Sequence, residues 1–101
     1  MNSLAQDLRR RALDIIRDPL CWTQSASARD SQCRSVSPRS PEARSFCGFG
    51  VLARAAHERG LSEWLLSDIF GPGALANLIR VNDSQNHDAV LACLHDLADG
   101  T

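Results

Sequence analysis

The stretch VLACLHDLA (residues 90–98) decides the fold class of this chain. Its apolar residues repeat at i, i+3, i+4, i+7 and i+8, namely Val90, Cys93, Leu94, Leu97 and Ala98. Because an α-helix completes a turn every ~3.6 residues, this spacing places all five on one face. The pattern predicts an amphipathic helix that ends before Gly100.

The same periodicity predicts a first helix that ends at Asp18, because Pro19 follows. Its inward face is Leu4, Leu8, Ala12, Ile15 and Ile16. A second helix is expected from Ser40-Pro41-Glu42, a strong start signal, to about Arg59, with Gly60 as its stop. Its interior is rich in small residues, so we expect it to be the buried central helix.

Two weaker patterns complete the helical prediction. A short helix is expected from Leu61 to Phe70, because Gly71-Pro72-Gly73 then breaks the pattern. Its predicted inward residues are Leu61, Trp64, Leu65 and Ile69. Residues 74–81 fit about one and a half helical turns but are ambiguous. Asn82-Asp83-Ser84 is expected to be a turn that also caps the last helix.

The segment between the first two helices, residues 19–40, is irregular. It contains six serines and few apolar residues after Trp22. Segments of this length are usually functional or partly disordered, so a motif and a linker both remain possible interpretations. The sequence therefore predicts an all-α fold: one compact domain over residues 1–101, with four to five helices and a long Ser-rich loop after the first.

Composition indicates a soluble, cytoplasmic protein. No apolar run approaches the ~20 residues of a membrane span, and no secretory signal is apparent. The four cysteines, Cys21, Cys33, Cys47 and Cys93, are widely spaced, so we expect reduced thiols without a disulfide. Their distances from the histidines also argue against zinc, and we expect no metal and no cofactor.

Charge is unevenly distributed along the chain. Residues 1–59 carry ten arginines against six acids, and residues 60–101 carry one arginine against six acids. All of these basic residues are arginine, and none is lysine. This bias has two possible origins, coding bias or selection for the bidentate contacts that arginine makes. Four of them recur at Arg29, Arg34, Arg39 and Arg44, where they could meet phosphates. The acidic second half and the lack of interleaved aromatics favour a solvated surface over nucleic-acid binding.

Cys47 is the one candidate nucleophile. The start of the central helix would lower the pKa of its thiol, and His87 is the plausible base. Asn82 or Asp83 would orient that base, and Gln24 would stabilise an oxyanion. The alternative, which we favour, is that Cys47 is a small buried apolar residue.

The polar residues outside the helices are grouped in short motifs. These are Trp22-Thr23-Gln24, Ala28-Arg29-Asp30, Phe46-Cys47-x-x-Gly50 and Asn82-Asp83, followed by His87 and Val90-Leu91. In this order they resemble a family of small proteins from bacteria and their phages and mobile elements, over about residues 12–98. The resemblance implies a shared fold and shared special residues, but no activity.

From the residues we expect Trp22 to be buried as the anchor of the long loop. We further expect Arg29 to pair with Asp83 or Asp30, and Asn82 to bind loop backbone. The candidate binding residues are Trp22, Gln24, Arg29, Asp30, Asn82 and Asp83. The favoured function is a non-enzymatic module that binds another protein; the mobile-element setting, with a host protein as partner, comes from the resemblance alone. The alternative is a thiol-dependent hydrolase or transferase that uses Cys47 and His87.

Overall fold

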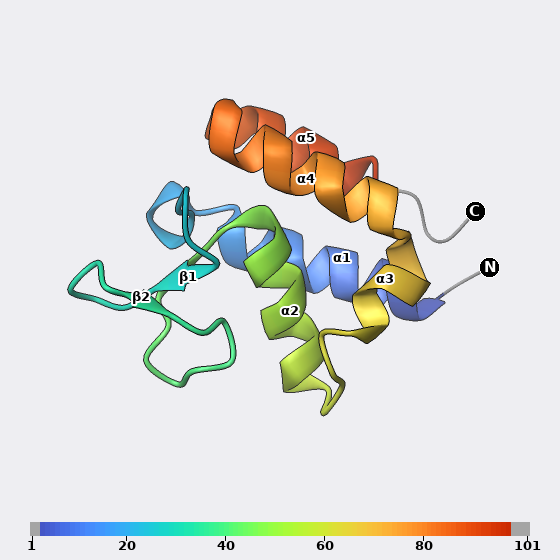
Figure 1. The fold of residues 1–101 in the computed structure, drawn as a ribbon, viewed down its shortest axis with the longest axis horizontal. Coiled ribbons are helices and arrows are strands. Elements are labelled where there is room, and N and C mark those ends of the chain that lie inside the picture. The colour runs from blue at the N-terminus through green and yellow to red at the C-terminus, as the bar shows by residue number, and fades with distance from the viewer. Residues whose placement is uncertain (1–2, 98–101) are drawn as a thin grey trace.

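The computed structural model describes residues 3–97, without the side chain of Ser3. This range contains five α-helices and a small three-stranded antiparallel sheet (Figure 1). The helices are α1 (Ser3–Ile16), α2 (Gly48–Glu58), α3 (Leu65–Phe70), α4 (Pro72–Ser84) and α5 (His87–His95). The predicted compact, mostly helical domain is therefore confirmed, with a sheet added to the long loop.

The core lies between α1, α2, α4 and α5. α1 packs against α2 and α5, and α4 packs against α5, α2 and α3. Figure 1 shows α4 and α5 side by side, while the sheet and α3 lie at opposite ends of the molecule. The interior of α2 is buried along Val51, Leu52, Ala53, Ala55 and Ala56, as predicted for the central helix. Its small residues allow the neighbouring elements to approach closely.

The predicted start of the central helix at Ser40 is wrong. α2 begins at Gly48, and Cys47 is its N-cap, with the sulfur accepting the N–H of Gly50 at 3.1 Å. The hydroxyl of Ser40 caps only a local turn by accepting the N–H of Glu42. The next residues, Ser45–Phe46, are extended because they pair with a strand, and this pairing overrides the local helix signal.

The long loop is more ordered than predicted. After a 3-10 turn, η1 (Pro19–Cys21), it contains β1 (Ala28–Arg29) and β2 (Ser35–Val36). The third strand is β3 (Ser45–Phe46), and β1 lies between the other two. Ala28 is opposite Val36 on one side and opposite Phe46 on the other. Two-residue strands leave almost no periodicity in the sequence, so this sheet was not predicted.

The third helix is shorter than predicted, and its buried face is shifted by one residue. It buries Leu66, Ile69 and Phe70, whereas Trp64 is 84% exposed and Leu65 is 39% exposed. The predicted inward positions of Trp64 and Leu65 are therefore wrong. Because the helix begins only at Leu65, the face that meets α4 is set by the i, i+3, i+4 spacing from Leu66.

α4 spans Pro72–Ser84 and is therefore longer than the helical pattern of residues 74–81. The expected turn at Asn82-Asp83-Ser84 is instead the last turn of this helix. α5 is capped by Asn86, whose side chain accepts the N–H of Ala89. Its predicted inward residues Val90, Leu94 and Leu97 are buried, and Ala98 lies outside the described residues. Between residues 3 and 97, no helix is long and apolar enough to cross a membrane.

Candidate functional site

Asn82 is fully buried near the end of α4 and connects three segments of the chain. Its Oδ1 accepts the indole N–H of Trp22 at 2.7 Å and the backbone N–H of Gly48 at 2.8 Å. Its Nδ2 donates to the backbone oxygen of Thr23 at 3.1 Å and to Asp83 Oδ1 at 3.2 Å. A side-chain amide has two donor hydrogens and two acceptor lone pairs, so every hydrogen-bonding position of Asn82 is used.

Gln24 and Ser25 attach the loop to the C-terminal end of α4. Gln24 Nε2 donates to the backbone oxygens of Asn82 and Gln85, each at 2.9 Å. These contacts occupy carbonyl oxygens in the last turn of the helix and just after it, where helical partners run out. The backbone N–H of Ser25 donates to Asp83 Oδ1 at 3.0 Å. The bond from Asn82 Nδ2 to the backbone oxygen of Thr23 confirms the expectation that Asn82 binds loop backbone.

Arg29 lies on β1 and also stabilises the long loop after α1, through bonds to other residues of that loop. Its guanidinium donates to Thr23 Oγ1 at 3.0 Å, to the backbone oxygen of Cys33 at 3.0 Å and to that of Gln24 at 3.3 Å. None of these acceptors is a carboxylate, so the predicted pairing with Asp83 or Asp30 is wrong. Both carboxylates are already engaged, one by Ser25 and the other by the turn after β1.

Asp30 is buried and organises that turn. Its Oδ1 accepts the backbone N–H groups of Gln32 and Arg34, and its Oδ2 accepts Arg34 Nε, all at 2.9 Å. The backbone bond from Arg34 is the main reason that the pKa of Asp30 lies below its ordinary value. Asp30 therefore holds the β1–β2 connection, apart from the Asn82 cluster.

Trp22 is half-buried against the core, and its indole N–H is fixed by Asn82. Its ring also meets the ring of His87 with centroids 5.3 Å apart at a tilt of 49°. The imidazole Nε2 of His87 contacts the backbone oxygen of Ile16, and because a carbonyl only accepts, Nε2 donates. Trp22 thus anchors the long loop, but it is half-buried rather than buried as predicted.

Cys47 is 8% exposed, and burial raises the pKa of its thiol above the ordinary value. Its sulfur accepts from Gly50, while the imidazole of His87 is bonded to Ile16. A thiol enzyme instead needs a lowered thiol pKa and a base in contact with the sulfur. The expectation that the helix start lowers the pKa of Cys47 is therefore wrong, while the thiol-enzyme hypothesis itself stays a prediction that thiol reactivity tests.

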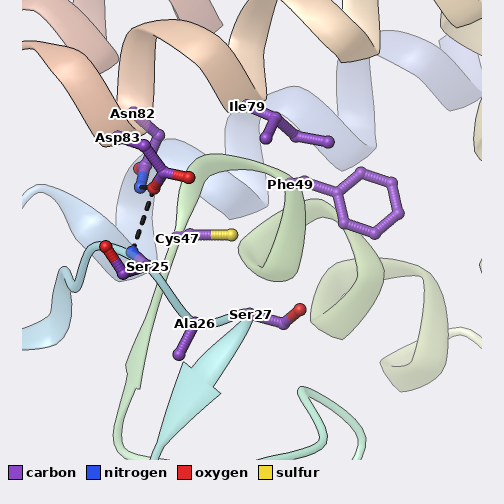
Figure 2. A pocket seen from close by; sticks show the side chains of 8 residues that line it. All are labelled: Ser25, Ala26, Ser27, Cys47, Phe49, Ile79, Asn82 and Asp83. Carbon is purple, nitrogen blue, oxygen red and sulfur yellow. Dashed lines mark hydrogen bonds between the residues drawn. The ribbon is translucent and has the colours of Figure 1, made fainter.

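A pocket of about 230 Å³ opens beside this cluster, and we call it the Cys47 pocket. It is lined by Ser25, Ala26, Ser27, Cys47, Phe49, Ile79, Asn82 and Asp83. Figure 2 shows the loop residues on one side, Asp83 and Ile79 from α4 on another, and Phe49 from α2 at the rim. Ser25 has a left-handed backbone (φ 66°), which is uncommon for a residue with a side chain.

The sequence indicated only part of this pocket. Cys47, Asn82 and Asp83 were candidates and line the pocket, whereas the candidates Arg29 and Asp30 do not line it. Phe49 and Ile79 were missed as site residues. Ile79 shares the helical spacing of the buried Leu75 and Leu78, yet it is 43% exposed. No sequence signal shows which residue of an apolar stripe will lie at a pocket mouth.

Neither a disulfide nor a cluster suited to a metal ion occurs within residues 3–97. All four cysteines are free, and no three residues of the His, Cys, Asp and Glu types lie in an arrangement that could hold a metal ion in this range.

Comparisons with protein-family models, curated proteins and solved structures find no match for this chain. The resemblance to small bacterial and mobile-element proteins therefore remains a prediction.

Proposed function

We propose that this chain is a non-enzymatic module that binds another protein, and that the Cys47 pocket receives a side chain of that partner. The observation that carries the proposal is the pocket itself. Its walls include the accessible side chain of Ile79, and its floor is fixed by the fully bonded Asn82. A site held in this way loses little freedom on binding, which favours affinity.

The predicted polar cluster contributes by positioning. The indole N–H of Trp22, the amide N–H groups of Gln24 and the whole side-chain amide of Asn82 already bond within the protein, so these groups are not free for a ligand. What faces outward is the mixed surface of Phe49, Ile79 and Asp83. The cluster therefore builds the pocket, and the pocket rim makes the contact.

The pocket chemistry supports a protein as the partner. Sites for small molecules usually enclose about 300–1,000 Å³, and this pocket is smaller and open to one side. Its one carboxylate, Asp83, would repel the phosphates of a nucleic acid. A single side chain that projects from a protein surface fits both features. If the mobile-element setting is right, that protein belongs to a bacterial host and is met in the cytoplasm.

The test is capture of partners from a lysate of the native host, with mass spectrometry to quantify each protein. Ile79→Arg fills the pocket, because an arginine at this position reaches Asp83 one helical turn further on. Trp64→Arg is the matched control, since Trp64 is exposed at the start of α3. The proposal expects a protein that Ile79→Arg loses and Trp64→Arg retains. Loss on Trp64→Arg alone would overturn it.

A further inference from the structure

We infer that the Cys47 pocket takes a cationic side chain, lysine or arginine, from the partner protein. The apolar stem would lie against Phe49 and Ile79, and the charged end would meet Asp83. This inference rests on the proposed function and adds the chemistry of the partner.

The carboxylate of Asp83 has a fixed orientation, and no cation within residues 3–97 forms an ion pair with it. Its Oδ1 accepts from the N–H of Ser25 and from Asn82 Nδ2, so the side chain has a set orientation. Figure 2 shows its other oxygen turned away from Ser25, toward the side of Cys47 and Phe49. Among residues 3–97, the ion pairs use Asp7, Asp14, Asp30, Glu58 and Asp96. Asp83 therefore offers an uncompensated negative charge at the pocket.

The two helix ends beside the pocket also favour a cationic ligand over an anionic one. Asp83 lies in the last turn of α4, where the negative end of the helix dipole attracts cations, although Gln24 already occupies the carbonyl oxygen of Asn82. The first turn of α2 would attract an anion through its N–H groups, but these groups already have partners. Gly48 N–H donates to Asn82 Oδ1, and the N–H groups of Phe49 and Gly50 interact with the sulfur of Cys47. An anion at the start of α2 would find these three amides already used, and it would also face Asp83.

The walls favour a long side chain over a simple ion. Lysine and arginine carry an apolar stem that packs on hydrophobic surface while the charged end stays hydrated. Phe49 and Ile79 supply such a surface beside the carboxylate, and the face of the Phe49 ring also attracts cations. A purely apolar side chain would cover Asp83 without a partner, at a cost in desolvation. The surrounding charge agrees, since residues 60–101 carry six acids and one arginine.

The direct test uses ¹⁵N-labelled protein titrated with blocked amino acids and followed by amide NMR shifts. The probes are N-acetyl-lysine methylamide, N-acetyl-arginine methylamide and N-acetyl-norleucine methylamide, the last being the uncharged counterpart of lysine. The cationic probes should shift the amides of Ser25, Ala26 and Asp83, and norleucine should bind more weakly by about three- to tenfold. Raising salt from about 0.01 M to about 1 M should weaken only the cationic probes.

Asp83→Asn removes the charge and keeps an oxygen for the N–H of Ser25, so the loop should stay in place. It should weaken lysine binding by about three- to tenfold and leave norleucine binding unchanged. Asp68→Asn is the matched control, because it removes one negative charge at an exposed position on α3. It should change the binding of neither the lysine probe nor the norleucine probe.

The possible failures are distinct. Equal binding of lysine and norleucine, or no effect of Asp83→Asn, overturns the cationic inference, even if Ile79→Arg still abolishes partner capture. A partner that is retained by Ile79→Arg overturns the proposed function itself. Pocket amides that shift on dilution of the free protein would show that a second copy fills the pocket, which also overturns the inference.

Discussion

The indole N–H of Trp22 donates to Asn82 Oδ1 at 2.7 Å, although 60 positions of chain separate the two residues. The same oxygen accepts the first amide of α2 from Gly48. One buried side chain therefore joins the loop after α1, the start of α2 and the end of α4. The Cys47 pocket lies at this junction, so its shape depends on a single amide.

The first prediction tests that dependence. Asn82→Leu keeps a similar volume but leaves the N–H groups of Trp22 and Gly48 and the oxygen of Thr23 without their partner. An unsatisfied buried polar group costs about 1–3 kcal/mol, and Trp22 is partly hydrated, so we expect a loss of about 3 kcal/mol. Urea unfolding followed by circular dichroism measures it.

Asn77→Leu provides the control, because it makes the same substitution at an exposed position of the same helix. Its effect on the free energy of unfolding should stay within about 0.5 kcal/mol. If the two variants unfold with equal free energies, Asn82 does not hold the junction.

The second prediction isolates the indole hydrogen bond. Trp22→Phe keeps an aromatic ring against the core and removes the N–H, so it should lower the free energy of unfolding by about 1 kcal/mol. Trp64→Phe removes an N–H at an exposed ring and should change it by less than about 0.5 kcal/mol. The same urea titrations compare them. A larger loss for Trp64→Phe would contradict the assignment of Trp22 as the anchor.

Sequence patterns predicted the helices well where tertiary contacts agreed with local preference. The apolar stripes of α1 and α5 follow the helical period, and both helices form there. Ser40-Pro41-Glu42 is an equally strong local signal, yet the chain turns there. Pairing of Phe46 with Ala28 and burial of its ring stabilise an extended segment instead. Such long-range pairing leaves no local trace.

The candidate site was predicted as a set of residues but not as a network. Trp22, Gln24, Asn82 and Asp83 do meet, because polar side chains in motifs beside an irregular loop must satisfy its backbone. The opposite charges of Arg29 and Asp83 suggested that they pair. The guanidinium instead donates to backbone carbonyl oxygens that lie close to it in the chain. The apolar pocket walls depend on how α2 and α4 pack, which periodicity does not specify.

The third prediction concerns pH and the thiols. Burial raises the pKa of Cys47, Cys21 and Cys93, so the folded chain keeps these protons after the unfolded chain has released them. The free energy of unfolding should therefore fall as pH rises above the ordinary thiol pKa of about 8.5. The chain has no lysine and no tyrosine, so few other groups titrate in this range. Urea unfolding at about pH 8 and about pH 10 measures the change.

Cys47→Ser separates the part due to Cys47. A serine hydroxyl does not titrate here and can still accept the N–H of Gly50 as an N-cap. The variant should lose stability less steeply with pH than the wild-type chain, and wild-type Cys47 should react slowly with thiol reagents near pH 7 relative to the exposed Cys33. Fast reaction at Cys47 would instead support the thiol-enzyme hypothesis.

The fourth prediction concerns two glycines whose replacement should act in opposite directions. A Cβ on Gly50 would lie 1.9 Å from the backbone oxygen of Ser27, which also accepts the N–H of Cys47. Backbone must move to relieve this contact, so Gly50→Ala should cost about 3 kcal/mol or more. A Cβ on Gly73 meets nothing within 4 Å, and alanine there should stabilise α4 by up to about 1 kcal/mol.

Gly48→Ala should fall between these two, because its Cβ would lie 2.8 Å from Leu78 Cδ1, the end of a flexible side chain. Thermal unfolding of the three variants gives the order directly. Gly50→Ala should also disturb the pocket, since the loop at Ser27 is one of its walls. A Gly50→Ala protein as stable as wild type would mean that this loop does not lie against α2, and the pocket would then lose that wall.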